Sequence, residues 1–105
     1  MNNKSGILRI DKVVAEFEVW LDADLFPFPK MKVKVLQRSE DFAAFSNVSR
    51  RDRFTGFADG IAGLGGTADE ALRDLLTRFD LDVRESLPQS GYVEADFAWS
   101  SPEDF

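Results

Sequence analysis

One amphipathic helix with a defined start and end constrains the fold more than any other stretch of this chain. Thr67 is a preferred N-cap residue, and Glu70 completes a capping box in which each side chain serves a free backbone N–H of the first turn. Because Pro88 disfavours helical geometry at Leu87, the helix is predicted to end by about Ser86. Its large apolar side chains recur at the helical period of about 3.6 residues and predict one buried face: Leu72, Leu75, Leu76, Phe79 and Val83.

The residues before this helix predict two strands that need a cover on one face. Apolar and charged side chains alternate from Lys12 to Asp22 and again from Lys30 to Arg38. The segment between them, Asp22 to Pro29, contains two prolines, which exclude a helix and indicate a turn. In the resulting antiparallel hairpin, lysines of the second strand are expected to lie across from glutamates of the first: Lys32 and Lys34 against Glu16 and Glu18.

Two further strands are predicted, at Phe54 to Ala58 and at Tyr92 to Trp99, the latter with Phe97 and Trp99 on one face. Residues 39–53 fit either a short helix or an edge segment. The sequence therefore predicts an α+β domain in the order β-β-β-α-β, an antiparallel sheet of three to four strands with one long amphipathic helix packed on one face. We expect a single domain over residues 1–105, with flexible ends at 1–6 and 100–105.

The glycine-rich stretch 60–66 precedes a helix N-terminus, where backbone N–H groups can bind an anion. It lacks the lysine of a phosphate-binding P-loop and contains no G-x-G-x-x-G. Asp69 and Glu70 would also repel phosphate there. The four glycines are therefore predicted to supply positive φ for turns and a bulge.

The absence of two residue types excludes much enzymatic chemistry. The chain has neither cysteine nor histidine, which excludes disulfides, thiolate and imidazole metal sites, and Ser-His-Asp or Cys-His catalysis. The remaining enzyme hypothesis is a magnesium site made by Asp59, Asp69 and Glu70, two of which the helix start already explains. We predict no enzyme and no cofactor.

The chain carries no apolar run of the roughly 20 residues that a transmembrane helix needs. Its first residues, MNNKSGILRIDK, lack the apolar core of a secretory signal. We therefore expect a cytoplasmic protein that does not bind membranes.

Charge is distributed unevenly along the chain. Residues 1–53 carry 10 basic and 8 acidic side chains, whereas residues 54–105 carry 3 basic and 11 acidic ones, which gives the formal net charge of −6. A strongly acidic second half favours a basic protein partner. The residues predicted to form the partner surface are Glu94, Asp96, Trp99, Glu103, Asp104 and Phe105.

The basic side chains offer an alternative surface for nucleic acid. They form a lysine row on the second strand and one arginine cluster: Lys30, Lys32 and Lys34, and Arg50, Arg51 and Arg53. An interrupting aspartate and a pI near 4.6 oppose this hypothesis. A homodimer is also compatible with the sequence, because four aromatic residues offer more surface than a small sheet covers: Trp20, Phe26, Phe28 and Trp99.

From Arg53 to Phe79 the chain runs from an expected strand through a glycine and a threonine to E-A-L at the helix start. The residues in this order are Gly56, Phe57, Gly66, Thr67, Glu70, Ala71 and Leu72. The stretch resembles the partial ribonuclease-H-like domain of HicB-type antitoxins, and with the preceding hairpin the resemblance spans about residues 12–86.

The resemblance implies a protein-binding domain that masks a small basic RNA-cleaving toxin. The family commonly adds a DNA-binding segment after the helix, whereas here an acidic strand and tail follow. A variant of the same functional class is a phage- or plasmid-type inhibitor whose acidic residues mimic nucleic acid. The sequence does not separate these two hypotheses.

Overall fold

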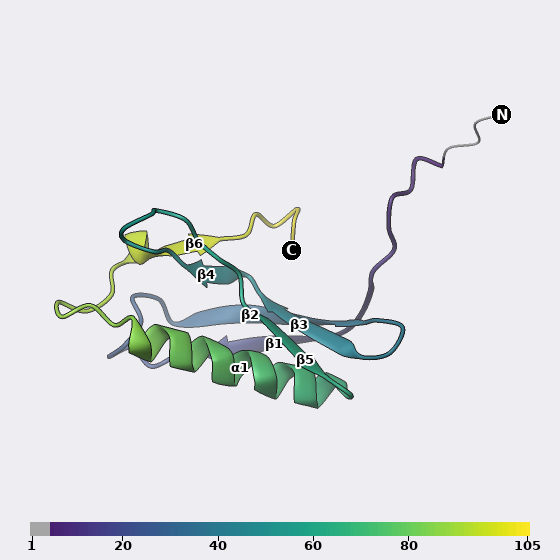
Figure 1. Cartoon of the computed structure of the whole chain (residues 1–105), viewed down its shortest axis with the longest axis horizontal. Helices are drawn as coiled ribbons and strands as arrows, with labels where there is room; N and C mark the ends of the chain where they lie inside the picture. The colour runs from purple at the N-terminus through teal and green to yellow at the C-terminus, as the bar shows by residue number, and fades with distance from the viewer. Residues whose placement is uncertain (1–4) are drawn as a thin grey trace.

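The computed structural model describes residues 5–105 and contains two antiparallel sheets and one long helix (Figure 1). The main sheet has the strand order β1-β2-β3-β5, and β4 pairs with β6 in a small second sheet. In chain order the elements are β1 (Lys12–Trp20), β2 (Lys30–Gln37), β3 (Phe42–Ser46), β4 (Val48–Arg50), β5 (Ala62–Gly65), α1 (Ala68–Glu85), the short 3-10 helix η1 (Glu94–Asp96) and β6 (Phe97–Trp99).

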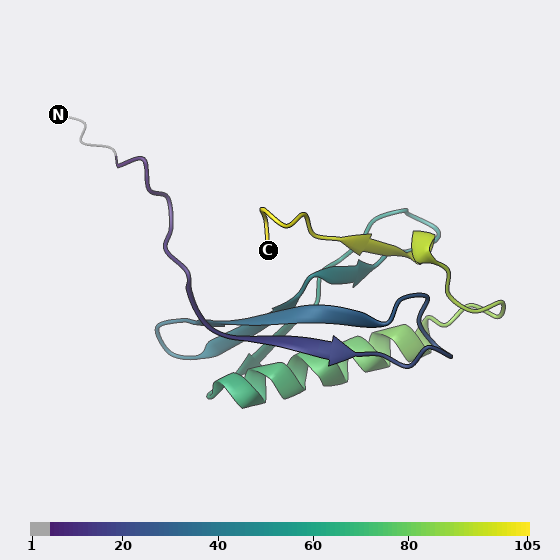
Figure 2. The ribbon, with the colours of Figure 1, turned by 180° about the vertical axis from the view of Figure 1, so that it is seen from behind.

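The α+β class, the antiparallel sheet and the covering helix are confirmed. The predicted order β-β-β-α-β is short of two strands, because the described residues before α1 form five strands and one more follows it. Figures 1 and 2 show α1 along one face of the main sheet and the β4–β6 pair beyond the other.

In the hairpin of β1 and β2 the lysines lie across from the glutamates as predicted, and the register places Glu16 opposite Lys34 and Glu18 opposite Lys32. Helix α1 also begins and ends as predicted. Thr67 accepts a hydrogen bond from the backbone N–H of Glu70 at 3.1 Å, and Ser86 is the C-cap. The Glu70 carboxylate accepts from the N–H of Gly66 at 3.0 Å, one residue before the position that a standard capping box would use.

The core lies between the main sheet and α1. The helix buries Leu75, Phe79 and Val83 as predicted, together with Ala71. Leu72 and Leu76 pack at the margin of this core. Phe26 and Phe28, which we expected to remain uncovered, are buried in an aromatic cluster with Phe79 and Phe97.

Three sequence-based assignments are corrected. Residues 54–58 form a turn and a single bridge residue instead of a third strand. The strands that follow β2 in the main sheet are β3 and β5. Residues 39–53 contain no helix, and β3 lies inside the sheet, between β2 and β5, rather than at its edge. The predicted strand from Tyr92 to Trp99 is shortened to β6, preceded by η1.

The glycine-rich stretch has a different role from the predicted one. Gly63 and Gly65 lie in β5, and neither has positive φ. A Cβ atom on Gly63 would lie 2.3 Å from the carbonyl oxygen of Ala71 and from the backbone nitrogen of Leu75. Glycine is therefore required here because the backbones of β5 and α1 are in direct contact.

Candidate functional site

The most unusual surface feature is the loop of residues 51–59, which we call the phenylalanine loop. It leads from β4 toward β5 and carries Phe54, whose side chain is 100% exposed, and Phe57, which is 74% exposed. Beside Phe54 a groove of about 420 Å³ separates the loop from residues 86–89 after α1. Two aromatic side chains are thus presented to solvent beside a concave surface.

Hydrogen bonds hold this loop in one conformation. Asp52 donates its N–H to the carbonyl of Phe57 and accepts from Gly56 with its own carbonyl, both at 2.8 Å. Its carboxylate accepts from the N–H groups of Thr55 and Phe54 at 3.0 and 2.7 Å. These backbone donors lower the pKa of Asp52. Gly56 has φ +76°, a conformation that favours glycine and completes the turn.

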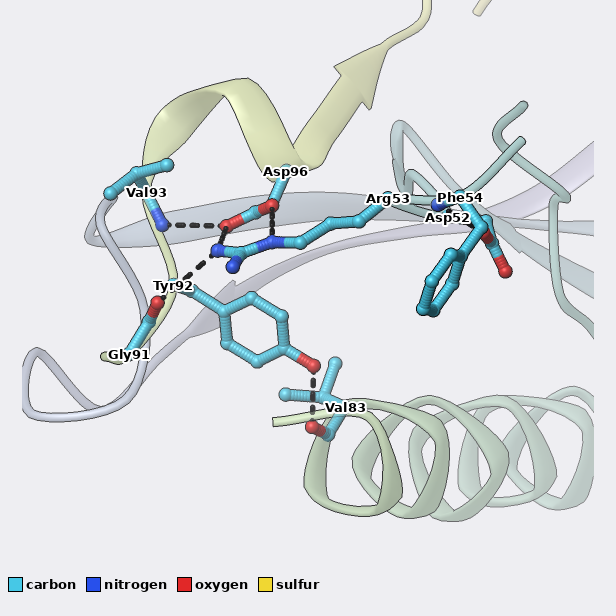
Figure 3. A network of polar contacts seen from close by, with 8 residues as sticks. All are labelled: Asp52, Arg53, Phe54, Val83, Gly91, Tyr92, Val93 and Asp96. Atoms are coloured by element: carbon cyan, nitrogen blue, oxygen red, sulfur yellow. Dashed lines mark hydrogen bonds and ion pairs between the residues drawn. The ribbon is translucent and has the colours of Figure 1, made fainter. Parts of the chain in front are cut away.

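An ion pair anchors the loop to the chain after α1 (Figure 3). Arg53 donates from Nε and Nη2 to the two carboxylate oxygens of Asp96, both at 2.7 Å. Asp96 is only 5% exposed and also accepts from the N–H of Val93 at 2.9 Å. The guanidinium of Arg53, together with this N–H, lowers the pKa of Asp96 to about 2.

The same end of the molecule is tied to α1 by two further contacts. Arg50 makes a two-point ion pair with Asp82 of the helix, at 2.8 and 3.1 Å. Tyr92 donates its hydroxyl proton to the carbonyl oxygen of Val83 at 2.6 Å, and burial raises the pKa of this tyrosine. The residues on which the loop is anchored, β4 before it and residues 92–96 after α1, are therefore themselves bonded to α1.

The predicted arginine cluster is mostly used within the chain. Arg50 and Arg53 are paired with aspartates, and Arg51 donates to the carbonyl of Gly56 at 2.9 Å. In the lysine row, Lys30 pairs with Glu18 at 3.1 Å, and Lys34 donates to the main-chain oxygen of Phe105 at 3.0 Å. Within residues 5–105 the side chain of Lys32 is the only one in this row that forms neither an ion pair nor a hydrogen bond. Little of this positive charge is left for an external anion.

The six residues predicted as a partner surface are not brought together as one patch. Asp96 lies inside the network described above, whereas Glu94 is exposed. Trp99 is half exposed and packs edge-on against Phe28. In the tail, Glu103 and Asp104 are exposed, and the ring of Phe105 covers Lys34 at 4.6 Å. The tail thus lies against β2, whereas Glu94 belongs to η1.

Ion pairing leaves the acidic character of the second half intact. Among the described residues from 54 onward, Arg73 is the only basic side chain outside an ion pair. The acidic side chains outside ion pairs there are Asp59, Asp69, Glu70, Glu85, Glu94, Glu103 and Asp104. The uncompensated charge of this part of the surface is therefore negative.

The carboxylates proposed as a magnesium site do not meet. Within residues 5–105 no group of three acidic side chains is arranged to hold a metal ion, so Asp59, Asp69 and Glu70 are not gathered.

Across the same residues, no helix has the length and apolar character needed to span a membrane.

Comparison with protein-family models, curated proteins and solved structures finds no match to this chain. The function is therefore inferred from the geometry of the surface. Phe54 and Phe57 were not among the predicted site residues, because residues 54–58 were assigned to a strand. The nearby Asp52 and Gly56, with D-R-F-T-G spacing typical of a turn, were the available signal.

Proposed function

We propose that this chain is a small protein-binding module that docks its phenylalanine loop into an apolar pocket of a basic protein partner. The observation that carries the proposal is Phe54, which is fully exposed on a loop that hydrogen bonds hold in place. A large aromatic side chain in this position contributes nothing to the core of the chain itself. It is suited to serve as an anchor in a complex.

The geometry favours a strong contact for its size. Buried aromatic residues dominate the binding energy of many protein interfaces, and arginine is also enriched there. Here the loop backbone is ordered before binding by Asp52 and by the Arg53–Asp96 pair. Less conformational entropy is then lost on association, which favours affinity.

Charge defines the kind of partner. The acidic side chains outside ion pairs include Asp59 within the loop and Glu94, two positions before Asp96. A basic surface around the apolar pocket would complement these carboxylates, and association would be fast and sensitive to salt. The Trp99, Glu103, Asp104 and Phe105 part of the earlier prediction would then be a separate, secondary surface.

The finer proposal, a HicB-like antitoxin or inhibitor that masks a basic toxin, is supported by the resemblance over about residues 12–86 and by this charge. An inhibitor that mimics nucleic acid would use the same acidic side chains without requiring the two phenylalanines. Nucleic-acid binding through the arginine cluster has less support, because Arg50 and Arg53 are already paired with aspartates.

The proposal is tested by capture from a lysate of the native host with three immobilised proteins: the wild type, the double variant F54A/F57A and the control L81A. Leu81 is an exposed leucine on α1 that does not line the groove beside Phe54, so L81A controls for the loss of an exposed apolar side chain elsewhere. Each capture is repeated after nuclease treatment and eluted with a salt gradient. Captured proteins are identified by mass spectrometry and remeasured in purified form by calorimetry.

We expect one basic protein to bind the wild type and L81A, to resist nuclease and to leave at high salt. Binding to F54A/F57A should be weaker by at least about 30-fold, because truncation of a central aromatic anchor costs at least about 2 kcal/mol. Equal binding by all three proteins would refute the role of the loop. Partners that disappear after nuclease treatment would refute the protein-binding proposal.

A further inference from the structure

The chain preceding β1 is a second apolar feature that its own body does not cover. Residues 5–11, which we call the N-terminal arm, extend away from the body of the molecule (Figure 2). The side chains of Ile7, Leu8 and Ile10 are 68%, 99% and 85% exposed. The arm continues directly into β1, which lies at the edge of the main sheet. An extended apolar segment at a free sheet edge is a template for pairing with another strand.

The two edges of the main sheet differ in this respect. At the β5 edge, the N–H of Leu64 already donates to the carboxylate of Asp74 of α1 at 2.9 Å, and β5 has only four residues. At the β1 edge, the pairing register with β2 shifts between Val13 and Ala15. Beyond that bulge the strand carries Glu16 and Glu18, whose charges discourage edge pairing. The unprotected part of this edge is therefore the stretch before the bulge, residues 7–13.

That stretch has a self-complementary sequence. If two copies pair antiparallel with Ile10 opposite Ile10, each Arg9 lies directly opposite Asp11 of the other chain. Cross-strand pairs of opposite charge stabilise antiparallel strands. In the single chain, Arg9 contacts its own Asp11 at 3.1 Å, and both side chains are exposed. The same two residues would form two reciprocal ion pairs between copies.

The same register also matches the main sheet. On the face away from α1, Val13, Leu36, Ala43 and Leu64 lie opposite one another across the four strands and form an apolar row. Pairing about Ile10 places Ile7 of the second copy opposite Val13, because directly opposed residues point to the same face. This isoleucine would extend the row by one strand and cover part of Val13, which is 48% exposed in the single chain.

We propose that residues 7–13 of two copies of this chain pair antiparallel about Ile10 and form a two-fold symmetric dimer. The occupant of this edge is a second copy, because the charge order Arg9–Ile10–Asp11 is complementary to itself. This surface lies apart from the phenylalanine loop, so the dimer and the proposed partner complex are independent, and each can be refuted without the other. The pairing is short, and the dimer is accordingly weak and concentration-dependent.

Charge exchange tests the register. In this pairing R9D sets two aspartates opposite each other and D11R sets two arginines opposite each other. Either variant should therefore raise the dimer dissociation constant at least about tenfold in sedimentation equilibrium. The double exchange R9D/D11R should restore the dimer. An equimolar mixture of the two single variants should form a heterodimer, because the opposed charges are then complementary. R73D, a charge change on α1, is the control.

A cross-linking experiment measures the geometry directly. The chain contains no cysteine, so a single introduced thiol can form only an intermolecular disulfide. I10C places the two thiols opposite each other and should cross-link rapidly under mild oxidation. L8C should cross-link far more slowly, because Leu8 lies opposite Lys12 in this register. Wild-type protein that sediments as a monomer at all concentrations, or equal cross-linking of I10C and L8C, would overturn the proposal.

Discussion

Strand β5, which packs against α1, and the phenylalanine loop are neighbouring segments that both contain glycine but have opposite roles. In β5, Gly63 has no side chain so that two backbones can touch, and the α1 residues that it meets, Ala71 and Leu75, are buried. In the loop, Gly56 permits a turn that directs Phe54 and Phe57 into solvent. One segment is fixed by close packing against α1, and the other by hydrogen bonds and the Arg53–Asp96 ion pair.

This difference separates stability from binding. Side chains between the sheet and α1 cannot change without altering the core, whereas the two loop phenylalanines can change without disturbing any packed neighbour. An exposed side chain that does not stabilise the fold is available to bind a partner. Substitutions should therefore show large effects on unfolding at β5, intermediate effects at the Arg53–Asp96 anchor and very small effects at Phe54.

The largest effect is expected for G63A. The added Cβ would lie 2.3 Å from two backbone atoms of α1, and backbone cannot rotate away as a side chain can. The free energy of unfolding should fall by at least about 3 kcal/mol, at the upper end of the usual cost of overpacking. Urea unfolding followed by circular dichroism measures this change.

The control for G63A is G60A in the same glycine-rich stretch. A Cβ on Gly60 would meet only the Oγ atom of Ser49, at an ordinary 3.8 Å, and Gly60 does not have positive φ. Its unfolding free energy should change by less than about 1 kcal/mol. Equal losses in both variants would show that the stretch needs glycine for its flexibility and not for contact with α1.

The success at α1 and the failure at β5 have one physical explanation. Thr67, Glu70 and the apolar residues of α1 act over a few positions, so a local sequence pattern contains the whole signal. The alternation in β1 and β2 is local in the same sense, and the hairpin with its facing lysines and glutamates was predicted correctly. Strand β5 has the sequence Ala-Gly-Leu-Gly. Its glycines are needed because α1, which follows in the chain, packs directly against their backbone, and a local pattern does not report that contact.

The candidate site could be predicted only in its acidic character. Asp96 was expected on an open surface, yet it is buried because Arg53, 43 positions earlier in the chain, pairs with it. No local pattern reports a contact of that separation. The phenylalanines were misassigned because aromatic residues are frequent in strands, and the turn chemistry of Asp52 and Gly56 decided the outcome.

An intermediate effect is expected for D96N, which removes the charge of the loop anchor with little change in shape. The variant keeps one acceptor oxygen, but the NH2 group that replaces the other cannot accept the second hydrogen bond from Arg53, whose side chain is about half exposed. We expect the free energy of unfolding at pH 7 to fall by about 1–2 kcal/mol. E94Q, at the nearby exposed carboxylate, should change it by less than about 0.5 kcal/mol.

The pH dependence gives the sign of this contribution. The folded-state pKa of Asp96 is about 2, below its ordinary value of 3.8. The anchor therefore stabilises the protein fully above pH 3.8, and this contribution is lost as the pH falls toward 2. The difference in unfolding free energy between wild type and D96N should shrink over that interval. A difference that stays constant would show that the pair is not ionised as described.

The smallest effect on stability is expected for F54A/F57A. Phe54 is fully exposed, and Phe57 is largely so, so the free energy of unfolding should remain within about 0.5 kcal/mol of the wild type. The same variant should lose the proposed partner, which makes it the sharpest separation of binding from folding in this chain. A loss of more than about 1 kcal/mol would mean that the two rings pack against the body of the protein in solution. In that case the phenylalanine loop would belong with β5 as a structural element, and the contrast between the two segments would fail.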